Sequence, residues 1–404
     1  MQPPRAALLL LCCASAAAGL QPPARRARAP PGQRRRVGTL RGGAAPLAAA
    51  ATAIAASPDK LFNAVFGGLA ATAVVAKAAT SAPADGKPRQ ADAAARELRR
   101  RFLPVFWLLR MADWLQGPYF YEVYASKVFD GQPASLELVS RLFLAGFGST
   151  ALFGPYVGRL ADARGRKLGT LCYAALYAGA AATTKSPVLW VLFAGRVLSG
   201  VGTSLLFSAP EAWLVGDAAR TKQQDALGGV FGAAYAGDAL VAILAGQLAA
   251  AAAAMRGPTG PFELSAGFLA AGALAAGLLW KENVADAGAA GEGPSVRDAV
   301  ATVRGDRKIL TVGAMQALFE GAMYIFVLQW PPALAKGVAK VFGSGAATPF
   351  GAVFSCFMVC CLLGSTTFQA LAARGVRTER KLSLIHISEP TRLRRISYAV
   401  FCLK

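Results

Sequence analysis

Apolar stretches of membrane-spanning length, separated by short polar segments, dominate this sequence. Beyond residue 101 they cover about residues 102–124, 137–157, 169–184, 188–214, 226–254, 262–280, 309–331 and 350–372. A helix needs about 20 mostly apolar residues to cross a bilayer, so each stretch predicts one transmembrane helix, of which the third is short. Leu61–Thr80 is just long enough for an additional helix, although Lys77 interrupts it. The pattern predicts an all-α polytopic membrane protein.

The composition supports a membrane protein and argues against a nucleic-acid-binding one. Of the 404 residues, 55% are hydrophobic and 16% are charged, and the formal net charge is +21. Much of that charge lies in residues 1–101, which hold 16 Lys and Arg against 4 Asp and Glu. Aromatic residues are not interleaved with basic ones as they are in a nucleic-acid-binding surface. The seven cysteines show no metal-ligand spacing, so we expect no metal and no cofactor.

The chain divides by composition into six segments. Residues 1–57 read as a leader: residues 6–18 are typical of a signal-peptide core, and the acid-free stretch after them is similar to a transit peptide, with a disordered tail as the alternative. Residues 58–101 hold the additional helix and a basic linker. We expect a six-helix N-terminal half at 102–280, a cytosolic linker at 281–308 and the first two helices of a C-terminal half at 309–381.

The last segment, residues 382–404, differs in kind from the rest. Its run LSLIHISEPTR resembles the translation of a sequencing adapter, so we treat residues 382–404 as an artefactual tail. The single histidine, His386, lies in this run, and we assign it no role in proton transfer.

A charged loop between the second and third predicted helices is the clearest local motif. Gly158 and Gly165 flank Asp162, and Arg166 and Lys167 follow. Gly158 would let helices approach closely, and Asp162 would accept hydrogen bonds from the start of a neighbouring helix. Loops on the same side hold 15 Lys and Arg against 5 on the opposite side, so the positive-inside rule places this loop in the cytosol. The residues by themselves indicate a solvated positive loop; a gating loop is what the resemblance of this motif to a transporter signature, given below, implies.

Two acids lie at similar depth in predicted spans of the two halves. Asp113 and Glu320 each fall about 11 residues into a helix, near the bilayer midplane. Ionisable groups there are costly and usually face a cavity or a partner, so both are candidates for substrate binding or coupling. Gln116 is a further candidate, just before a Gly-Pro pair that should bend the helix. Glu320 shares one helix face with Gln316 and Tyr324.

Arg196 is the strongest basic candidate. It opens the run Arg-Val-Leu-Ser-Gly-Val-Gly in the fourth span, and a buried guanidinium can bind an oxyanion through several donors. The alternative is a structural tie to a carboxylate on a neighbouring helix. Glu211 is also a candidate, but it lies too far along the helix to pair with Arg196. For Asp113 the alternative is neutralisation by Arg110, one turn away, and Asp238 is a mid-span acid without a motif.

These blocks together resemble one branch of a known family. Asp-Trp-Leu-Gln-Gly-Pro-Tyr at 113–119, Gly-Arg-Val-Leu-Ser-Gly at 195–200, Leu-Leu-Phe-Ser-Ala-Pro-Glu-Ala-Trp at 205–213 and Gln-Ala-Leu-Phe-Glu at 316–320 look like the molybdate-anion transporter branch of the major facilitator superfamily. The resemblance covers about residues 101–381, and the additional N-terminal helix is also similar to that branch. The charged loop resembles the superfamily signature, although Ala163 stands where a basic residue is usual.

The resemblance implies a major facilitator fold and a transport function. The family has twelve core helices, of which about eight are expected here, and the helix that faces Asp162 in the family would belong to the remaining four. It implies uptake of molybdate, a tetrahedral dianion, by alternating access. Physical chemistry alone does not select molybdate, because sulfate and phosphate are oxyanions of similar size.

Two other classes of function stay open at this point. The first alternative is a transporter of a different solute, such as sulfate, phosphate or a sugar. The second is a non-transporting membrane receptor or scaffold. An enzyme is disfavoured, because the sequence holds no nucleophile elbow and no metal cluster. The expected partners are a small inorganic oxyanion, the lipid bilayer and, in one version of the mechanism, protons. The plasma membrane is the favoured location, with a plastid or another endomembrane as the alternative.

Overall fold

The computed structural model describes residues 57–80, 91–284 and 296–375. The expected leader up to residue 56 and the expected tail at 382–404 lie outside these residues, as does part of the linker between the two predicted halves. The described chain is helical except for one short hairpin and the connecting loops.

The helices follow one another with short connections. In chain order they are α3 (Pro58–Thr80), α4 (Ala91–Gln116), the 3-10 turn η1 (Gly117–Tyr119), α5 (Phe120–Ala125), α6 (Leu136–Arg164), α7 (Arg166–Thr183), α8 (Leu189–Leu206), α9 (Ala209–Arg220), η2 (Gln224–Ala226), α10 (Leu227–Arg256), η3 (Gly257–Thr259), α11 (Gly260–Leu279), α13 (Val296–Gly305), α14 (Arg307–Phe342) and α15 (Phe350–Ala373). The strands β1 (Val128–Phe129) and β2 (Gln132–Pro133) pair antiparallel between α5 and α6.

Each predicted span corresponds to helix in the structure, with two interruptions. The predicted bend at Gly117-Pro118 is confirmed, since η1 separates α4 from α5. The predicted span 188–214 lies within one stretch long enough to cross a membrane, Leu189–Arg220, but this stretch is interrupted at Phe207–Ser208, where α8 ends before α9 begins. Pro210 explains the restart: it lacks a backbone N–H and is therefore tolerated in a first helical turn but not inside a helix.

Length and composition identify most of these helices as membrane-spanning. Within the described residues, six helical stretches are long and apolar enough to cross a bilayer, and one of them contains both α10 and α11. The helix α4 is not among the six, because its first half holds a run of arginines and its second half holds Arg110 and Asp113. The helix α4 therefore carries several of the residues that are candidates for a functional site, Arg110, Asp113 and Gln116.

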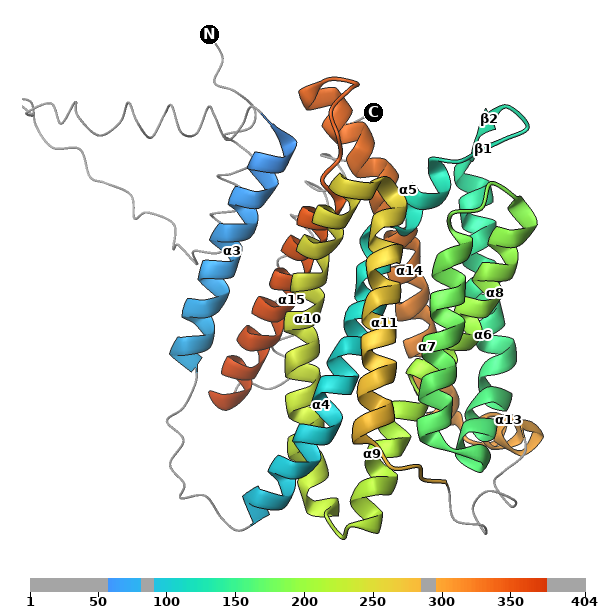
Figure 1. Ribbon diagram of the computed structural model, residues 1–404. Helices are drawn as coiled ribbons and strands as arrows, with labels where there is room; N and C mark the ends of the chain where they lie inside the picture. Colours follow the sequence, from blue (N-terminus) through green and yellow to red (C-terminus); the bar gives the residue numbers. More distant parts are fainter. Residues whose placement is uncertain (1–56, 81–90, 285–295, 376–404) are drawn as a thin grey trace, which may run out of the picture.

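The bundle is arranged around α4, which packs against both α10 and α11. The helix α8 packs between α6 and α7, and α7 joins this group to α11. On the other side α15 packs on α10, and α3 lies against α15 at the edge of the bundle, as Figure 1 shows. The additional helix is thus a peripheral element attached to α15.

Small residues bring α10 and α15 into close contact. A side chain placed on Gly246 would meet the Gly351 carbonyl oxygen at 2.7 Å, and one on Gly351 would meet the Gly246 carbonyl oxygen at 2.3 Å. The Ser355 hydroxyl donates to the Ile243 carbonyl at 2.8 Å across the same contact. Close backbone approach with hydrogen bonds across it is a common way for helices to associate in lipid. Here it joins a helix of the first predicted half to one of the second.

An aromatic stack closes the end of the bundle where α6 meets α7. Trp280 stacks on Trp213, with ring centroids 4.1 Å apart, and on its other side it stacks on Phe102 at 6.1 Å. The Trp213 indole donates to the Lys281 carbonyl at 2.8 Å, and the Trp280 indole donates to the Arg101 carbonyl at 2.9 Å. Because these rings come from α4, α9 and the end of α11, they hold three helices together at this end.

Candidate functional site

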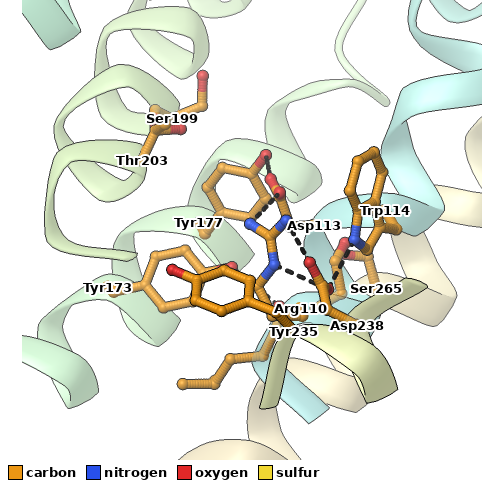
Figure 2. A network of polar contacts seen from close by, with 12 residues as sticks. Arg110, Asp113, Trp114, Tyr173, Tyr177, Ser199, Thr203, Tyr235, Asp238 and Ser265 are labelled. Carbon is orange, nitrogen blue, oxygen red and sulfur yellow. Dashed lines mark hydrogen bonds and ion pairs between the residues drawn. The ribbon is translucent and has the colours of Figure 1, made fainter. Parts of the chain in front are cut away.

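A buried ion-pair cluster joins α4 to α10 in the middle of the bundle. Arg110 Nε donates to Asp238 Oδ1 at 3.0 Å, and Arg110 Nη2 donates to Asp238 Oδ2 at 2.9 Å. Arg110 is 9% exposed and Asp238 is 7% exposed. The geometry is a bidentate fork, which is the strongest arrangement of an arginine and a carboxylate. Figure 2 shows the Arg110 guanidinium lying between Asp238 and a second carboxylate, Asp113.

Asp113 is held by an arginine on its own helix and a tyrosine from α7. Arg110 Nη1 lies 3.4 Å from Asp113 Oδ2, and the Tyr177 hydroxyl donates to Asp113 Oδ1 at 2.8 Å. On the other side of the cluster the Trp114 indole donates to Asp238 Oδ1 at 2.9 Å. The neutralisation of Asp113 by Arg110 is therefore present, but the closer partner of Arg110 is Asp238.

Arg196 lies near this cluster but is bound differently. Its guanidinium carbon lies 4.7 Å from the centre of the Phe120 ring, and it lies beside the Tyr124 hydroxyl. Its charge also acts on the Tyr177 hydroxyl, which connects it to Asp113. Among the described residues Arg196 makes no ion pair with a carboxylate, and its Nε is buried without a hydrogen-bond partner. The structural tie to a neighbouring carboxylate is not what the described chain shows.

The four central charges balance when all are ionised. Arg110 and Arg196 contribute two positive charges, and Asp113 and Asp238 contribute two negative ones. Arg110 is bonded to two carboxylates, whereas Arg196 contacts no carboxylate among the described residues and its Nε has no hydrogen-bond partner. A bound anion would make the site negative unless an acid became protonated, because charge buried away from water has to be compensated.

The structure gives the candidate Gln116 a packing role. Its Nε2 donates to the Ser265 hydroxyl at 2.9 Å, and that hydroxyl donates to the Ala112 carbonyl at 2.6 Å. Gln116 is buried and Ser265 is fully buried, so both lie in the contact between α4 and α11 rather than on an open surface. Polar side chains that bond across packed helices in this way stabilise the contact.

Glu211 lies in the first turn of α9 and bonds to α10. The hydroxyl of Tyr235 donates to the Glu211 carboxylate. Glu211 does not pair with Arg196, as its distance along the chain predicted. An acid in a first helical turn is also favoured by the helix dipole, so the setting of Glu211 has a structural explanation.

Glu320 comes to this region from α14. Gln316 Nε2 donates to Glu320 Oε1 at 2.8 Å, which confirms that these two side chains share a helix face. Tyr324, one turn further, lies close enough to both Glu320 and Asp113 for their charges to act on its hydroxyl. The Tyr324 ring packs against Phe143 and Phe147 of α6, with centroids 5.9 and 4.3 Å away. An aromatic contact between α6 and α14 thus lies beside the charged cluster.

The charged loop between α6 and α7 is held by hydrogen bonds to the end of α11 and the residues after it, which its sequence did not indicate. Asp162 Oδ1 accepts from Arg166 Nε at 2.9 Å, within one turn of the chain. A different carboxylate, that of Glu282, lies at the start of α7, while the helix expected to face Asp162 belongs to the later helices of the family, so that role of Asp162 stays a prediction. The carboxylate of Glu282 accepts from the backbone N–H groups of Lys167 and Leu168, at 2.8 and 2.9 Å.

The glycines and the lysine of the loop fit around that carboxylate. Gly165 has φ of 136° and joins α6 to α7, and a side chain there would meet the Glu282 carboxyl carbon at 2.5 Å. Lys167 Nζ donates to the Gly277 and Trp280 carbonyls at 2.8 and 2.9 Å, which are unpaired acceptors at the end of α11. A Cβ added to Gly158 would lie 4.0 Å from the Ser208 hydroxyl oxygen, between α8 and α9, so Gly158 is not tightly packed.

Removing the Glu282 carboxylate should loosen the α6–α7 loop. In Glu282→Ala the first N–H groups of α7 lose their charged acceptor, which costs about 1 kcal/mol at such an exposed position. We expect faster trypsin cleavage at Arg164, Arg166 and Lys167 in detergent-solubilised protein. Glu137→Ala is the matched control, since Glu137 is an exposed acid that pairs only with Arg141 at the other end of α6. Equal cleavage rates in both variants would contradict this role of Glu282.

Sequence reasoning missed the partners that complete the cluster. Asp238 carried no motif, and its pairing with Arg110 spans 128 positions in sequence. Tyr177 read as part of an apolar helix, and Glu282 as part of a polar linker. Only the charged residues inside spans could have been predicted from sequence to have a partner, because such residues nearly always pair within the bundle.

Comparison with known proteins relates the chain to a transporter family. A family of sugar transporters with 12 transmembrane helices matches residues 61–391. A molybdate-anion transporter of Xenopus tropicalis is 31% identical over 307 residues, which cover 74% of this chain and 62% of that protein. A molybdate-anion transporter of Takifugu rubripes is 31% identical over 301 residues, 68% of this chain and 60% of that protein.

The match with solved structures is weaker. An auto-inhibited peptide transporter of the POT family has 15% sequence identity and a TM-score of 0.41, covering 70% of this chain and 55% of that chain. The chain spans about 60% of the length of the curated relatives it matches. The family match over residues 61–391, together with the all-α membrane architecture, shows that the chain belongs to this transporter family of the major facilitator superfamily, and the chain is similar to molybdate-anion transporters.

Proposed function

We propose that this protein takes up molybdate or a similar inorganic oxyanion across a membrane by alternating access. The observation that carries the proposal is Arg196, a cation inside the bundle that has no carboxylate partner in the described chain. The names of the relatives support an anion as the substrate. A transporter, rather than an enzyme, also agrees with the matched family.

Arg196 would bind the substrate, and the aromatic residues around it would shape the site. A guanidinium presents several donors to a tetrahedral oxyanion, and the adjoining Tyr124 hydroxyl would supply another. Phe120 faces the guanidinium and limits its contact with water. The low local dielectric then strengthens the attraction between Arg196 and a bound anion.

Protons are the favoured coupling ion in this proposal. The four central charges balance when all are ionised, so a dianion would enter more readily if an acid took up a proton. Asp113 is the best placed acid, because Tyr177 connects it to Arg196 and only one of its oxygens lies against Arg110. Glu320 would contribute from the second half through Tyr324, and Glu211 would have a structural role.

The end of the molecule with the α6–α7 loop would face the cytosol. Figure 1 shows this loop, α9 and α13 at one end and the β-hairpin at the other. This agrees with the assignment of successive loops to opposite sides of the membrane, from which the Lys and Arg were counted. Gly158, Asp162, Gly165, Arg166 and Lys167 would form the gating loop, and Glu282 would hold it against α11. The plasma membrane is the proposed location.

Uptake by the full-length protein in proteoliposomes tests the substrate. We expect uptake of molybdate that tungstate inhibits strongly, sulfate inhibits weakly and glucose does not inhibit, because tungstate matches molybdate most closely in size and charge. Inhibition by glucose alone would favour the second candidate, a sugar transporter, which the description of the matched family supports. Well-folded protein that moves neither solute would favour the receptor or scaffold.

A further inference from the structure

The short helix α13 carries an apolar face that the described chain leaves exposed. Val300 and Val303 are one turn apart and lie on one side of the helix. Val300 is 44% exposed and Val303 is 39% exposed. The helix contacts α14, the element that follows it. Exposed valines on a helix beside a membrane span have an obvious environment to enter, the lipid.

The depth of α13 in the membrane is set by α14. Only Asp306 separates the two helices, and its side chain caps α14 by accepting from the backbone N–H of Lys308 at 2.7 Å. The exposed apolar surface of α14 begins at once, since Ile309 and Leu310 are 44% and 50% exposed. The hydrocarbon region therefore starts within about one turn of α13. Figure 1 draws α13 across the direction of the membrane helices, as expected of a helix in the interface plane.

The charges around α13 match an anionic membrane surface. Arg297 and Arg304 lie on the helix, and Arg307 and Lys308 begin α14. The acids of the segment are fewer, Asp298 and Asp306. Basic residues next to a membrane span are attracted by the anionic lipids of the cytosolic leaflet. The valines and the basic residues thus point to the same partner.

We infer that α13 is an interfacial helix, with its valines inserted at the acyl–headgroup boundary of the cytosolic leaflet and its arginines bound to anionic phospholipid. This inference does not depend on the transported solute. It makes α13 a membrane anchor at the point where the linker enters the second predicted half. Movement of α14 would then be coupled to the position of α13 on the membrane surface.

Photo-crosslinking of the full-length protein in liposomes tests this inference. A benzophenone amino acid is placed at Val303 on the apolar face or at Ala301 on the opposite face, in phosphatidylcholine vesicles with and without phosphatidylserine. We expect phospholipid adducts from position 303 and their loss at position 301. Adducts to protein from position 303, or equal lipid adducts from both positions, would overturn the inference.

The arginines provide the second measurement. Replacing Arg297 and Arg304 with Gln should lower the enrichment of phosphatidylserine over phosphatidylcholine in the adduct, by up to about fivefold for each arginine. Unchanged enrichment would remove the anionic-lipid part of the inference. Hydrogen exchange of the unsubstituted protein is independent of any variant: α13 amides should be protected in vesicles with phosphatidylserine, and equal exchange in detergent would also overturn the inference.

Discussion

Replacing Arg196 with Ala in the full-length protein should abolish molybdate uptake while the protein still reaches the membrane. The reason is that Arg196 makes no direct ion pair with a carboxylate among the described residues, so its removal breaks no salt bridge, and the one excess negative charge of the cluster is relieved when an acid takes up a proton. Folding should therefore suffer little, whereas the anion loses its main donor. Uptake of radiolabelled molybdate, normalised to the amount of protein at the membrane, measures the effect.

Two further variants separate anion binding from general damage. Arg196→Lys keeps the charge but loses the planar set of donors, so uptake should fall with a raised KM rather than disappear. Arg141→Ala is the matched control, because Arg141 is an exposed arginine that pairs with Glu137 at the start of α6, away from the charged cluster. Normal uptake by Arg196→Ala would exclude Arg196 from the site.

Replacing Asp238 with Ala should have the opposite consequence, a loss of folding. Arg110 would remain buried with only the longer contact to Asp113, and breaking one side of a buried ion pair typically costs about 3–5 kcal/mol. We expect a low yield of monodisperse protein in detergent and a lower unfolding temperature. Asp225→Ala is the matched control, since Asp225 is an exposed acid just before the same helix.

A double variant distinguishes structural from functional roles of this pair. Arg110→Met with Asp238→Leu removes both charges and keeps the side chains large, so much of the lost stability should return. If the pair is structural, molybdate uptake should return with it. If Arg110 is needed to set the charge state of Asp113, as the proposed proton coupling requires, folding should return without the dependence of uptake on pH. Full stability of the single Asp238→Ala variant would contradict the buried-pair argument.

The candidate site was only partly predictable from sequence. Asp113 and Arg196 stood out because an ionisable residue inside an apolar stretch is conspicuous. What each one binds was not visible. Arg110 finds Asp238 on α10, and Asp113 finds Tyr177 on α7, and both partners are distant in sequence. Gln116 shows the same limit, because its place before a Gly-Pro pair indicated a site but did not reveal its contact with Ser265 of α11.

The loop between α6 and α7 shows the limit most clearly. Its glycines, acid and bases were read as a unit, and the acid within the unit was expected to meet a helix start. Any carboxylate that the fold brings to the start of a helix can accept hydrogen bonds from its first N–H groups. At the start of α7 that carboxylate belongs to Glu282, which follows α11. Asp162 instead pairs locally with Arg166. The resemblance assigns the helix that faces Asp162 to the later helices of the second half, so this role of Asp162 stays a prediction, whereas the contact of Glu282 with α7 depends on where α11 ends.

Local composition was enough to identify the membrane character of the chain and the positions of its spans, because crossing a bilayer requires about 20 consecutive apolar residues. Motifs within the spans were enough to indicate its transporter family. The folded arrangement decided which buried charges neutralise one another and which one has no carboxylate partner in the described chain. That decision depends on the packing of α4 against α10 and α7, where Arg110 is enclosed by carboxylates and Arg196 is left facing an aromatic ring.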